Sequence, residues 1–322
     1  MYDLSIVIPA RNEEWLARTI QDILEHKEGK TEIIATLDGA WANPGIPQHP
    51  DVNIIYVPVA TGQRAATNIA VKLSKAKYVM KVDAHCAFDQ GFDRKMIEFM
   101  QEHGDDTTAV PIMRNLWVFD WKCYNCGWKK YQGPTPTECG ACGKKDNIKK
   151  KVVWNPKPRP ASWSYCFDAE PHFQYFEDYK HREETKKLRA KGYTETMSLQ
   201  GSCFMATRDK YWELNLSDET LGSWGNQGIE VACKTSLSGG KVLVNHNTFY
   251  AHLFRTQGGD FVPHYLGELD VRKTKTRVKE LIFDKGFPGQ KLPVSYLVEK
   301  FWPVAGWTEE DLKKLKETEF KP

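Results

Sequence analysis

Apolar and polar positions along the first third of the chain follow two alternating spacings. Short apolar runs of strand length occupy residues 4–9, 32–37, 53–57, 78–82 and 108–112, and segments with helical spacing begin near residues 14, 65 and 92. Strands that alternate with helices in this way form parallel sheets with crossover helices. We therefore predict an α/β domain with a mostly parallel sheet, helices on both faces, and functional groups at the carboxyl ends of the strands.

The same spacing predicts which side of each helix is buried. In the first helix, one face carries Leu16, Ile20, Ile23 and Leu24. In the helix at 65–73, Ile69 and Leu73 are expected to point inward. The third helix is expected at 92–100.

The alternation breaks near Trp117. Residues 122–160 contain five prolines and many lysines, which is typical of an insertion or a small subdomain. Regular structure is expected to resume near Met197, with helices at 210–214 and 229–237 and strands at 241–244 and 248–253. Residues 261–322 are expected to be helical, and Thr308 to Asp311 resembles a capping box in which Asp replaces the usual Glu.

The cysteines add a metal site to this picture. Four of the eight cysteines form two Cys-x2-Cys pairs, Cys123 with Cys126 and Cys139 with Cys142. Two such pairs, separated by a short spacer with glycines for tight turns, predict tetrahedral Zn²⁺ held by four thiolates. Four protein ligands leave no open position, so this zinc is expected to be structural. The alternative is two redox dithiols. The other four cysteines are expected in the core, and they are Cys86, Cys166, Cys203 and Cys233.

The net charge of +3 conceals two regions of opposite charge. Residues 122–160 contain ten Lys or Arg and two acidic side chains, a net charge of +8, so the rest of the chain carries −5. Six aromatic residues lie in or beside this segment, namely Trp121, Tyr124, Trp128, Tyr131, Trp154 and Trp163. Basic charge with interleaved aromatics suits phosphate contact and base stacking. The alternative is a solvated surface whose aromatics pack a small zinc-centred core.

Composition excludes two classes of protein. The chain has 41% hydrophobic and 12% aromatic residues, which excludes a disordered chain, and its apolar runs are too short to span a bilayer. The first residues lack the basic and long apolar regions of a secretory signal. We therefore expect a soluble cytoplasmic protein, in the host cytoplasm if the source is viral, with no membrane partner.

A candidate catalytic pair ends the fourth predicted strand. Asp83 and His85 lie two residues apart after an apolar run, so both are expected at the ligand-facing edge of the sheet. A carboxylate and an imidazole suit Mn²⁺ or a similar divalent cation.

Six sequence blocks extend this pattern from the first strand to residue 255. They are Ile-Val-Ile-Pro-Ala-Arg-Asn-Glu at 6–13, Thr-Leu-Asp-Gly at 36–39, Asp-Ala-His-Cys at 83–86, Gly-Ser-Cys-Phe at 201–204, Trp-Gly-Asn-Gln-Gly-Ile-Glu at 224–230 and His-Leu-Phe-Arg at 252–255. In order and content they resemble the GT-A fold nucleotide-sugar glycosyltransferases of the family 2 group, and most of all the polypeptide N-acetylgalactosaminyltransferases. The resemblance implies a Rossmann-like GT-A fold, here with an inserted zinc ribbon and a helical C-terminal region.

The resemblance also implies a role for individual residues. Asp83, His85 and His252 would hold the divalent metal, Asp38 would bind the uracil or ribose, and Trp224 would shape the sugar pocket. The implied nucleotide-sugar-binding set is Pro9, Ala10, Arg11, Glu13, Asp38, Arg64, Asp83 and Arg255. The implied catalytic set is Asp83, His85, Trp224, Gln227 and Glu230.

Several of these residues have a structural alternative. Asp38 is equally consistent with capping a turn, His252 with an ordinary strand-end histidine, and Trp224 with a core position. Asn12 and Glu13 are expected to cap the first helix whatever else they do. Arg64 follows Gly62 on the first turn of a helix, and both a nucleotide contact and a structural role stay open for it.

The block at 224–230 departs from the family pattern. Gln227 and Gly228 stand where the family has Glu and Asn, and neither side chain can deprotonate an acceptor hydroxyl. We therefore favour a retaining mechanism in which the departing phosphate receives the acceptor proton. A displaced base role for Glu230 is the alternative.

The acceptor is expected to be chosen by residues 115–195, which the resemblance does not cover. We divide the chain into a nucleotide-sugar-binding half (1–114), a basic zinc-ribbon insertion (115–165), an acceptor-side half (166–260) and a helical C-terminal extension (261–322). The basic insertion favours a nucleic acid acceptor, namely 5-hydroxymethylcytosine or 5-hydroxymethyluracil in DNA of the kind made by bacterial viruses.

Two alternatives to this acceptor stay open. The first is a saccharide, cell-envelope or protein hydroxyl, with the ribbon only bracing the fold. The second belongs to another class of protein, a nucleic-acid-binding zinc module on an inactive transferase core.

Overall fold

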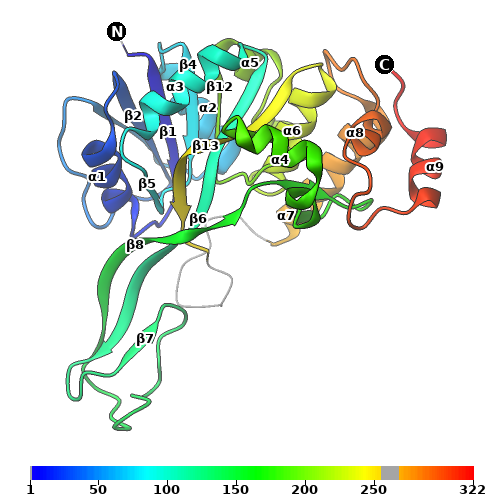
Figure 1. The fold of residues 1–322 in the computed structure, drawn as a ribbon. Coiled ribbons are helices and arrows are strands. Elements are labelled where there is room, and N and C mark those ends of the chain that lie inside the picture. The colour runs from blue at the N-terminus through cyan, green and yellow to red at the C-terminus, as the bar shows by residue number, and fades with distance from the viewer. Residues whose placement is uncertain (1, 255–267) are drawn as a thin grey trace.

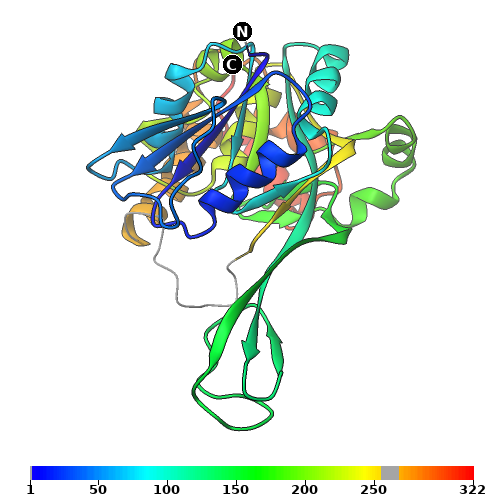
Figure 2. The same ribbon diagram turned by 90° about the vertical axis from the view of Figure 1, so that its left-hand side faces the viewer.

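A computed structural model describes residues 2–254 and 268–322, and shows a body from which a long arm projects (Figures 1 and 2). The parallel half of the body is built on β1 (Leu4–Ala10), which pairs in parallel with β2 (Thr31–Asp38) and β4 (Tyr78–Val82). β2 in turn pairs in parallel with β3 (Val52–Val57) at the sheet edge.

Both faces of this sheet are covered by helices, as predicted. α1 (Leu16–His26) and α3 (Phe92–His103) pack on one face, in a core that includes Ile6 and Ile8 of β1. α2 (Gln63–Leu73) and α6 (Gln227–Leu237) pack on the other, in a core that includes Val7. Alternate residues of β1 thus enter two different cores, because successive side chains of a strand point to opposite faces. This arrangement confirms the predicted α/β fold class.

The second half of the sheet is mixed in direction. β12 (Cys203–Thr207) runs antiparallel between β4 and β6 (Thr107–Cys123). β13 (Lys241–His252) runs parallel to β6, and the short β5 (Cys86–Phe88) pairs antiparallel with its end. The two strands predicted at 241–244 and 248–253 are one strand, whose register with β6 shifts between Asn245 and Phe249.

The arm is a continuation of the sheet. β6 runs past Trp117, where the sequence predicted a break, and pairs antiparallel with β8 (Ile148–Ser162) and with the short β7 (Lys129–Tyr131). Its base is anchored to α1, where Trp154 Nε1 donates to Asp22 Oδ2 at 2.8 Å. Lys150 Nζ lies 2.8 Å from Glu14 Oε1 just before the helix. Residues 122–160 are therefore the outer part of a hairpin that begins inside the body (Figure 1).

Regular structure between the arm and Met197 was missed by the sequence analysis. β9 (Tyr165–Phe167), β10 (Phe173–Tyr175), a 3-10 helix (Asp178–His181), α4 (Glu183–Ala190) and β11 (Tyr193–Glu195) all precede it. These strands are three residues long, and α4 buries only Thr185. Elements this short and polar have no readable apolar period.

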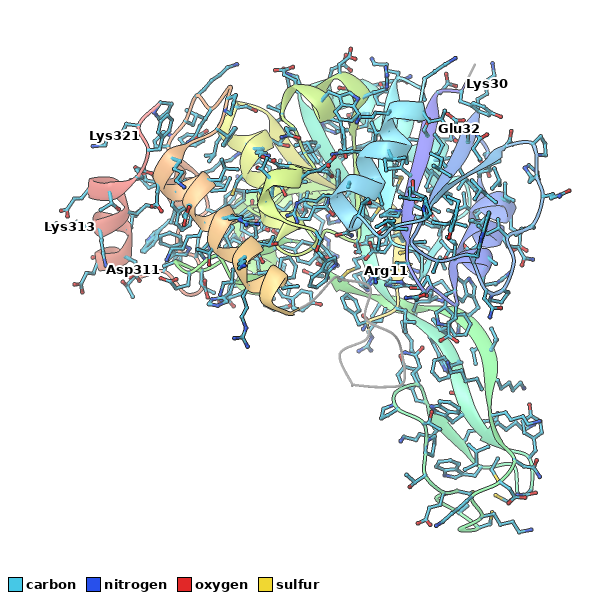
Figure 3. All side chains as sticks on the ribbon, turned by 180° about the vertical axis from the view of Figure 1, so that it is seen from behind. Arg11, Lys30, Glu32, Asp311, Lys313 and Lys321 are labelled. Carbon is cyan, nitrogen blue, oxygen red and sulfur yellow. The ribbon has the colours of Figure 1, made fainter. Side chains whose placement is uncertain are left out.

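The C-terminal helices pack against α6 and β9 of the body. α7 (Glu268–Lys279), a π-helical turn (Glu280–Lys285), α8 (Val294–Lys300) and α9 (Glu309–Thr318) share a core with α6 and β9. Two short helices, α5 (Arg208–Glu213) and a 3-10 turn (Glu219–Leu221), precede α6. The capping box of α9 is confirmed, because the Thr308 and Asp311 side chains each bond the other's backbone N–H. Figure 3 shows Asp311 and Lys313 on α9, at the end of the body remote from the arm.

The buried face of α2 differs from the prediction. Leu73 is 50% exposed and Ile69 is half-buried, whereas Arg64 is fully buried. Arg64 Nε and Nη2 lie 3.1 and 2.8 Å from Glu230 Oε2 of α6, and Nη2 also donates to Gly225 O at 2.7 Å. Lys234 Nζ contacts the other Glu230 oxygen at 3.1 Å. A buried charge needs such partners, so the ion pair decides which face of α2 turns inward.

Replacing Arg64 with Met is expected to destabilise the fold by about 3–5 kcal/mol, because it leaves the buried Glu230 carboxylate without its main partner. The measurement is urea-induced unfolding. The matched control is Arg94→Met, which removes an ion-paired Arg that is 50% exposed and is expected to cost under about 1 kcal/mol. Equal losses in the two variants would contradict the structural role of the Arg64–Glu230 pair.

Candidate active site and zinc centre

A pocket opens at the carboxyl ends of β1, β2 and β4, where the α/β pattern predicted it. Its empty volume is about 460 Å³, part of which is open to the solvent. Its lining residues are Pro9, Ala10, Arg11, Glu13, Asp38, Gln63, Ala66, Asp83, Ala84, His85 and Trp224.

Three candidate metal ligands meet beside this pocket. Asp83 follows β4 directly, and its N–H donates to Ser202 O at 2.8 Å. His252 ends β13 and is paired in register with Cys86 of β5, which places it next to His85. One ligand atom from each of Asp83, His85 and His252 lies within 4.8 Å of the others. The strand pairing thus joins residues that are far apart in the sequence.

The hydrogen bonds around these residues fit a metal site. His85 Nδ1 lies 3.0 Å from Glu13 Oε2, which orients the ring and leaves Nε2 free to bind a metal. Both ring nitrogens of His252 are buried and without a hydrogen bond to the described residues, although Nε2 lies 3.3 Å from Asp83 Oδ2. Buried polar atoms normally have a partner, so the two orphaned nitrogens point to a missing ligand.

The charge states of Asp83 and His252 also suit a cation. Burial raises the pKa of Asp83, but the neighbouring Lys81 ammonium and His252 outweigh it, so the pKa is lowered. Burial lowers the pKa of His252 to about 4, against the attraction of Asp83. At neutral pH the site therefore presents a carboxylate and a neutral imidazole, which are the forms that bind metal.

Glu13 and Asp38 each hold a loop of the pocket wall. Glu13 Oε1 accepts the Trp15 N–H at 3.1 Å, which braces the turn into α1. The two Asp38 oxygens accept the N–H groups of Thr61 at 2.6 Å and Gly62 at 2.8 Å. Gly62 has φ +98°, and a Cβ there would lie 2.4 Å from Ser223 Cβ. Asp38 thus closes a loop that packs against the segment carrying Trp224; its contact with uracil or ribose stays a prediction.

Three of the other candidate residues lie away from the pocket lining. Arg64 and Glu230 form the buried pair between α2 and α6, so neither the nucleotide contact of Arg64 nor the base role of Glu230 fits its position. Gln227 is 4% exposed and donates to Ser217 Oγ at 2.9 Å. Arg255 lies outside the described residues. A Cβ on Gly228 would lie 1.9 Å from Leu199 O, so only glycine fits this position without a shift of the backbone.

Two polar residues at the site were missed by the sequence analysis. Gln63 lines the pocket, and its Nε2 lies 3.4 Å from Asp83 Oδ1. Lys81 is buried in β4; its Nζ contacts the Asp83 carboxylate and donates to Gly201 O at 2.6 Å. A lysine inside the otherwise apolar run Tyr-Val-Met-Lys-Val was the signal that could have identified Lys81.

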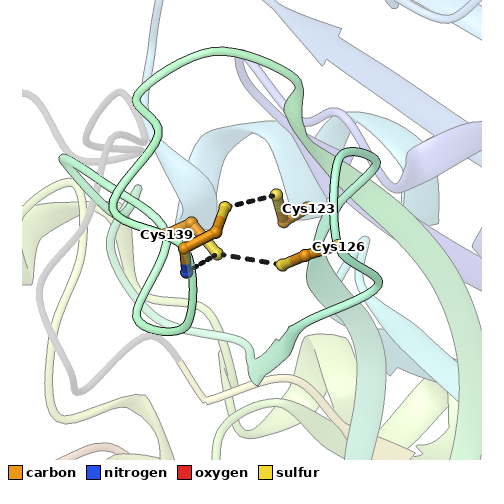
Figure 4. A group of neighbouring side chains, drawn as sticks. Cys123, Cys126 and Cys139 are labelled. Carbon is orange, nitrogen blue, oxygen red and sulfur yellow. Dashed lines mark hydrogen bonds between the residues drawn. The ribbon is translucent and has the colours of Figure 1, made fainter.

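The four cysteines of the two Cys-x2-Cys pairs converge near the tip of the arm (Figure 4). Their sulfur atoms all lie within 4.8 Å of one another, with Cys123 and Cys142 3.9 Å apart and Cys126 and Cys139 3.5 Å apart. Four thiolates around Zn²⁺ are about 3.8 Å apart, since Zn–S bonds are about 2.3 Å. One four-thiolate site fits this geometry better than two separate dithiols.

The backbone supports the same interpretation. The N–H groups of Ala141 and Cys142 point at Cys139 Sγ, at 3.4 and 3.5 Å. Burial opposes ionisation of Cys139, but these N–H groups lower the pKa of its thiol to about 6. Gly127 and Gly143 have φ values of +82° and +68°, as the tight turns require.

One family model matches the part of the chain that contains the pocket strands. Residues 5–131 match the family model described as Glycosyl transferase family 2. This matched segment is less than half of the chain, and over it the chain is similar to the family 2 glycosyltransferases. The match extends into residues 115–131, which were expected to lie outside the resemblance.

Curated relatives agree over a shorter segment. N-acetylgalactosaminyltransferase 7 of Rattus norvegicus and of Homo sapiens are each 32% identical to this chain over 90 residues. That segment is 27% of this chain and 14% of each relative, so the similarity spans about one seventh of the curated proteins.

A solved structure extends the likeness to the whole fold. The crystal structure of GalNAc-T7 with UDP, GalNAc and Mn²⁺ aligns with a TM-score of 0.62 and 19% identity, covering 98% of this chain and 54% of that chain. The fold is therefore GT-A. Among the described residues, no helix combines the length and the apolar character that crossing a bilayer requires.

We expect purified protein to contain one zinc ion per chain at the four-cysteine site, measured by elemental analysis. Cys139→Ser removes one of the four thiolates and is expected to lose the zinc and to expose residues 124–147 to limited proteolysis, while the body stays folded. The control is Cys233→Ala, a buried cysteine outside the cluster, which is expected to retain zinc. Wild-type protein without zinc would contradict the assignment.

Proposed function

We propose that this protein transfers a sugar from a UDP-sugar to a hydroxyl group in a metal-dependent reaction. The observation that carries the proposal is the convergence of Asp83, His85 and His252 beside a pocket at the carboxyl ends of the strands. The family 2 match and the GT-A fold, which is also that of a structure with UDP, GalNAc and Mn²⁺, support the same reaction class.

Different residues of the pocket would bind different parts of the donor. Asp83, His85 and His252 would hold Mn²⁺ or another divalent cation, which when bound neutralises charge on the leaving diphosphate. Arg11 lines the pocket, and its Nη1 is buried without a partner among the described residues. We assign Arg11 to the anionic part of the nucleotide, because a buried guanidinium N–H without a partner favours an oxygen acceptor. Asp38 and Trp224 would contact the nucleoside and the sugar.

We propose that the reaction retains the configuration at the anomeric carbon. The acidic residues in the described pocket lining are Glu13, Asp38 and Asp83. Glu13 contacts His85, Asp38 accepts hydrogen bonds from the loop at 61–62, and Asp83 pairs with Lys81. The pocket lining therefore supplies no free carboxylate as a base. In the retaining reaction the sugar–phosphate bond breaks, the acceptor oxygen attacks from the same side, and its proton passes to a phosphate oxygen of the departing UDP.

For the acceptor we propose a 5-hydroxymethylpyrimidine in DNA. The arm supports this choice, because residues 122–160 carry a net charge of +8 and the arm begins beside the site. Asn115 of β6 is paired in register with His252, and Lys150 of β8 bonds Glu14 just after the pocket-lining Glu13. Figure 3 shows Arg11 on the part of the body from which the arm projects. A saccharide or protein hydroxyl would instead leave the arm with a bracing role only.

Replacing Asp83 with Asn is expected to lower Mn²⁺-dependent hydrolysis of UDP-sugars by at least about 100-fold, because a ligand worth several kcal/mol of charge stabilisation is lost. A screen of donors followed by UDP release measures this. Asp89→Asn is the control, because Asp89 pairs with Lys95 outside the pocket lining. Full activity in the Asp83 variant would remove the metal assignment, and no turnover of any donor by the wild type would favour a binding-only protein.

The same hydrolysis reports the stereochemistry. Proton NMR is expected to show the α-anomer of the released sugar as the first product from a UDP-α-sugar, because the new bond forms on the face that UDP leaves. First formation of the β-anomer would overturn retention and would require a base from elsewhere in the chain.

The acceptor is tested by transfer of labelled sugar to hydroxymethylated DNA, with unmodified DNA of the same sequence as the control. We expect label in the hydroxymethylated DNA alone, since only that base carries the reacting hydroxyl. Label in neither DNA, together with transfer to small saccharides, would reject the DNA acceptor and leave the glycosyltransferase proposal intact.

A further inference from the structure

The outer arm is a three-stranded sheet whose register sorts its side chains onto two faces. β6 lies between β7 and β8, and one row across the sheet is Lys129, Lys122 and Lys149. The next row is Lys130, Trp121 and Lys150, and the third is Tyr131, Asp120 and Lys151. Paired residues share a face and successive residues alternate, so the first and third rows lie on one face and the second lies on the other.

The face that carries the second row packs on the body around Trp121, whereas Lys130 of the same row is exposed. Trp121 is 7% exposed, and Phe119 stacks on Trp15 at the start of α1, with ring centroids 5.9 Å apart. Lys150 lies over these rings and bonds Glu14. Trp121 and Trp154 are therefore core residues that anchor the arm, which settles their role in favour of the structural alternative.

The opposite face, formed by the first and third rows, is basic and open to solvent. Lys129, Lys149 and Lys151 are exposed and Lys122 is half-buried, and none of the four has an ion-pair partner among the residues that the structure describes. Asp120 is the one carboxylate in these two rows, and it is 7% exposed and accepts the Trp117 Nε1–H at 2.9 Å. We call Lys122, Lys129, Lys149 and Lys151 the lysine face.

Exposed aromatic rings border the lysine face. Tyr124 and Tyr131 are 55% and 41% exposed. Lys122 Nζ lies 4.8 Å from the ring centroid of Tyr124, and Lys157 Nζ lies 4.9 Å from that of Tyr131. These rings lie at the edge of the positive charge, and each keeps about half of its surface exposed to solvent.

In the absence of a partner, the lysine face carries unfavourable electrostatic repulsion between its side chains. Like charges directly opposite one another on neighbouring strands, as in the row of Lys129, Lys122 and Lys149, repel with Cβ atoms about 5 Å apart. The one carboxylate in the two rows, Asp120, is buried and accepts the Trp117 Nε1–H. A polyanion removes this repulsion and gains entropy from the release of its counterions. Tyrosines beside the phosphate contacts favour a nucleic acid, because exposed bases stack on aromatic rings. An anionic membrane would require a larger apolar surface than two tyrosines provide.

We propose that the lysine face, together with Tyr124 and Tyr131, binds the phosphate backbone of a nucleic acid and holds it near the pocket. β6 runs without interruption from Asn115, which is paired with His252, to Lys122. At about 3.3 Å per residue the lysine face lies roughly 20 Å along the strand from the metal ligands. The inference rests on the proposed function only in making this nucleic acid the acceptor, because binding is measured without turnover.

The test is fluorescence anisotropy with a labelled 20-nucleotide DNA, single-stranded and duplex, at several salt concentrations. The variant replaces Lys122, Lys129, Lys149 and Lys151 with Gln. The control replaces four other lysines with Gln, so the change in net charge is equal. They are Lys30, Lys72, Lys75 and Lys313, which are exposed and without an ion pair among the described residues. Zinc content and circular dichroism establish that both proteins are folded.

We expect the lysine-face variant to bind DNA at least about 100-fold more weakly at low salt. We also expect it to lose about three to four units of the slope of log affinity against log salt, since each lost phosphate contact removes about 0.9. The control variant is expected to match the wild type. Tyr131→Ala is expected to weaken single-stranded DNA about tenfold and duplex much less, because only unpaired bases reach the ring.

Three outcomes would overturn the inference. They are equal affinity in the lysine-face and control variants, no DNA binding by the wild type, and binding to phosphatidylserine vesicles instead of DNA. Its failure can be told apart from failure of the proposed function. Wild-type protein that hydrolyses a UDP-sugar but binds no nucleic acid refutes the lysine face alone, and protein that binds DNA but turns over no donor refutes the transferase alone.

Discussion

The position of β13 is the constraint on which the rest of the molecule depends. This strand pairs in parallel with β6 along one side, and its last residues pair antiparallel with β5. The second pairing carries His252 to Asp83 and His85, which completes the candidate metal site. The first positions β6, whose outer half becomes the arm. A shift of β13 by one residue would reverse every side chain on it, and would remove His252 from the site.

Buried charge is the second feature that organises the body, and it is used to hold the walls of the pocket. Lys81 lies under Asp83 and reaches the Gly201 carbonyl, and Arg64 ties α2 to α6 and to the backbone at Gly225, next to Trp224. The side chains of both cations are fully buried. Removing one partner of a buried pair is costly, so these contacts tie the helix positions to the shape of the site.

The arm needs its own source of stability, because a hairpin that projects from the body has no core of its own to bury its inner face. Near the body, that face is covered by α1, through the stacking of Phe119 on Trp15 and the bond from Trp154 to Asp22. Farther out, none of the described helices or strands of the body covers the four converging cysteines, and a metal held by four thiolates would take the place of a core there. The opposite face is exposed to solvent, so its lysines can contact a partner molecule.

Features that depend on neighbouring residues could be derived from the sequence by itself. The alternation of strands and helices, the two Cys-x2-Cys pairs, the Asp-x-His after the fourth strand and the capping box at Thr308 were all predicted in place, because each is a short-range pattern with a local physical cause. The pocket residues Pro9, Ala10, Arg11, Asp38 and Asp83 were also found, through blocks that resemble a known family.

Only the tertiary structure decided which distant groups become partners. The sequence offers Glu230 as an alternative base, but Arg64 and Lys234 enclose its carboxylate. The helical spacing also predicts that Leu73 points inward, but Arg64 occupies the buried face of α2 and Leu73 is exposed. Trp121 and Trp154 are buried whereas Tyr124 and Tyr131 are exposed. The covering of one face of the arm by α1 decides this difference. The segment from β9 to β11 was missed because its short elements are stabilised by neighbours and have too few residues to show a period. Burial and ion pairing are set by long-range contacts, so no local pattern contains them.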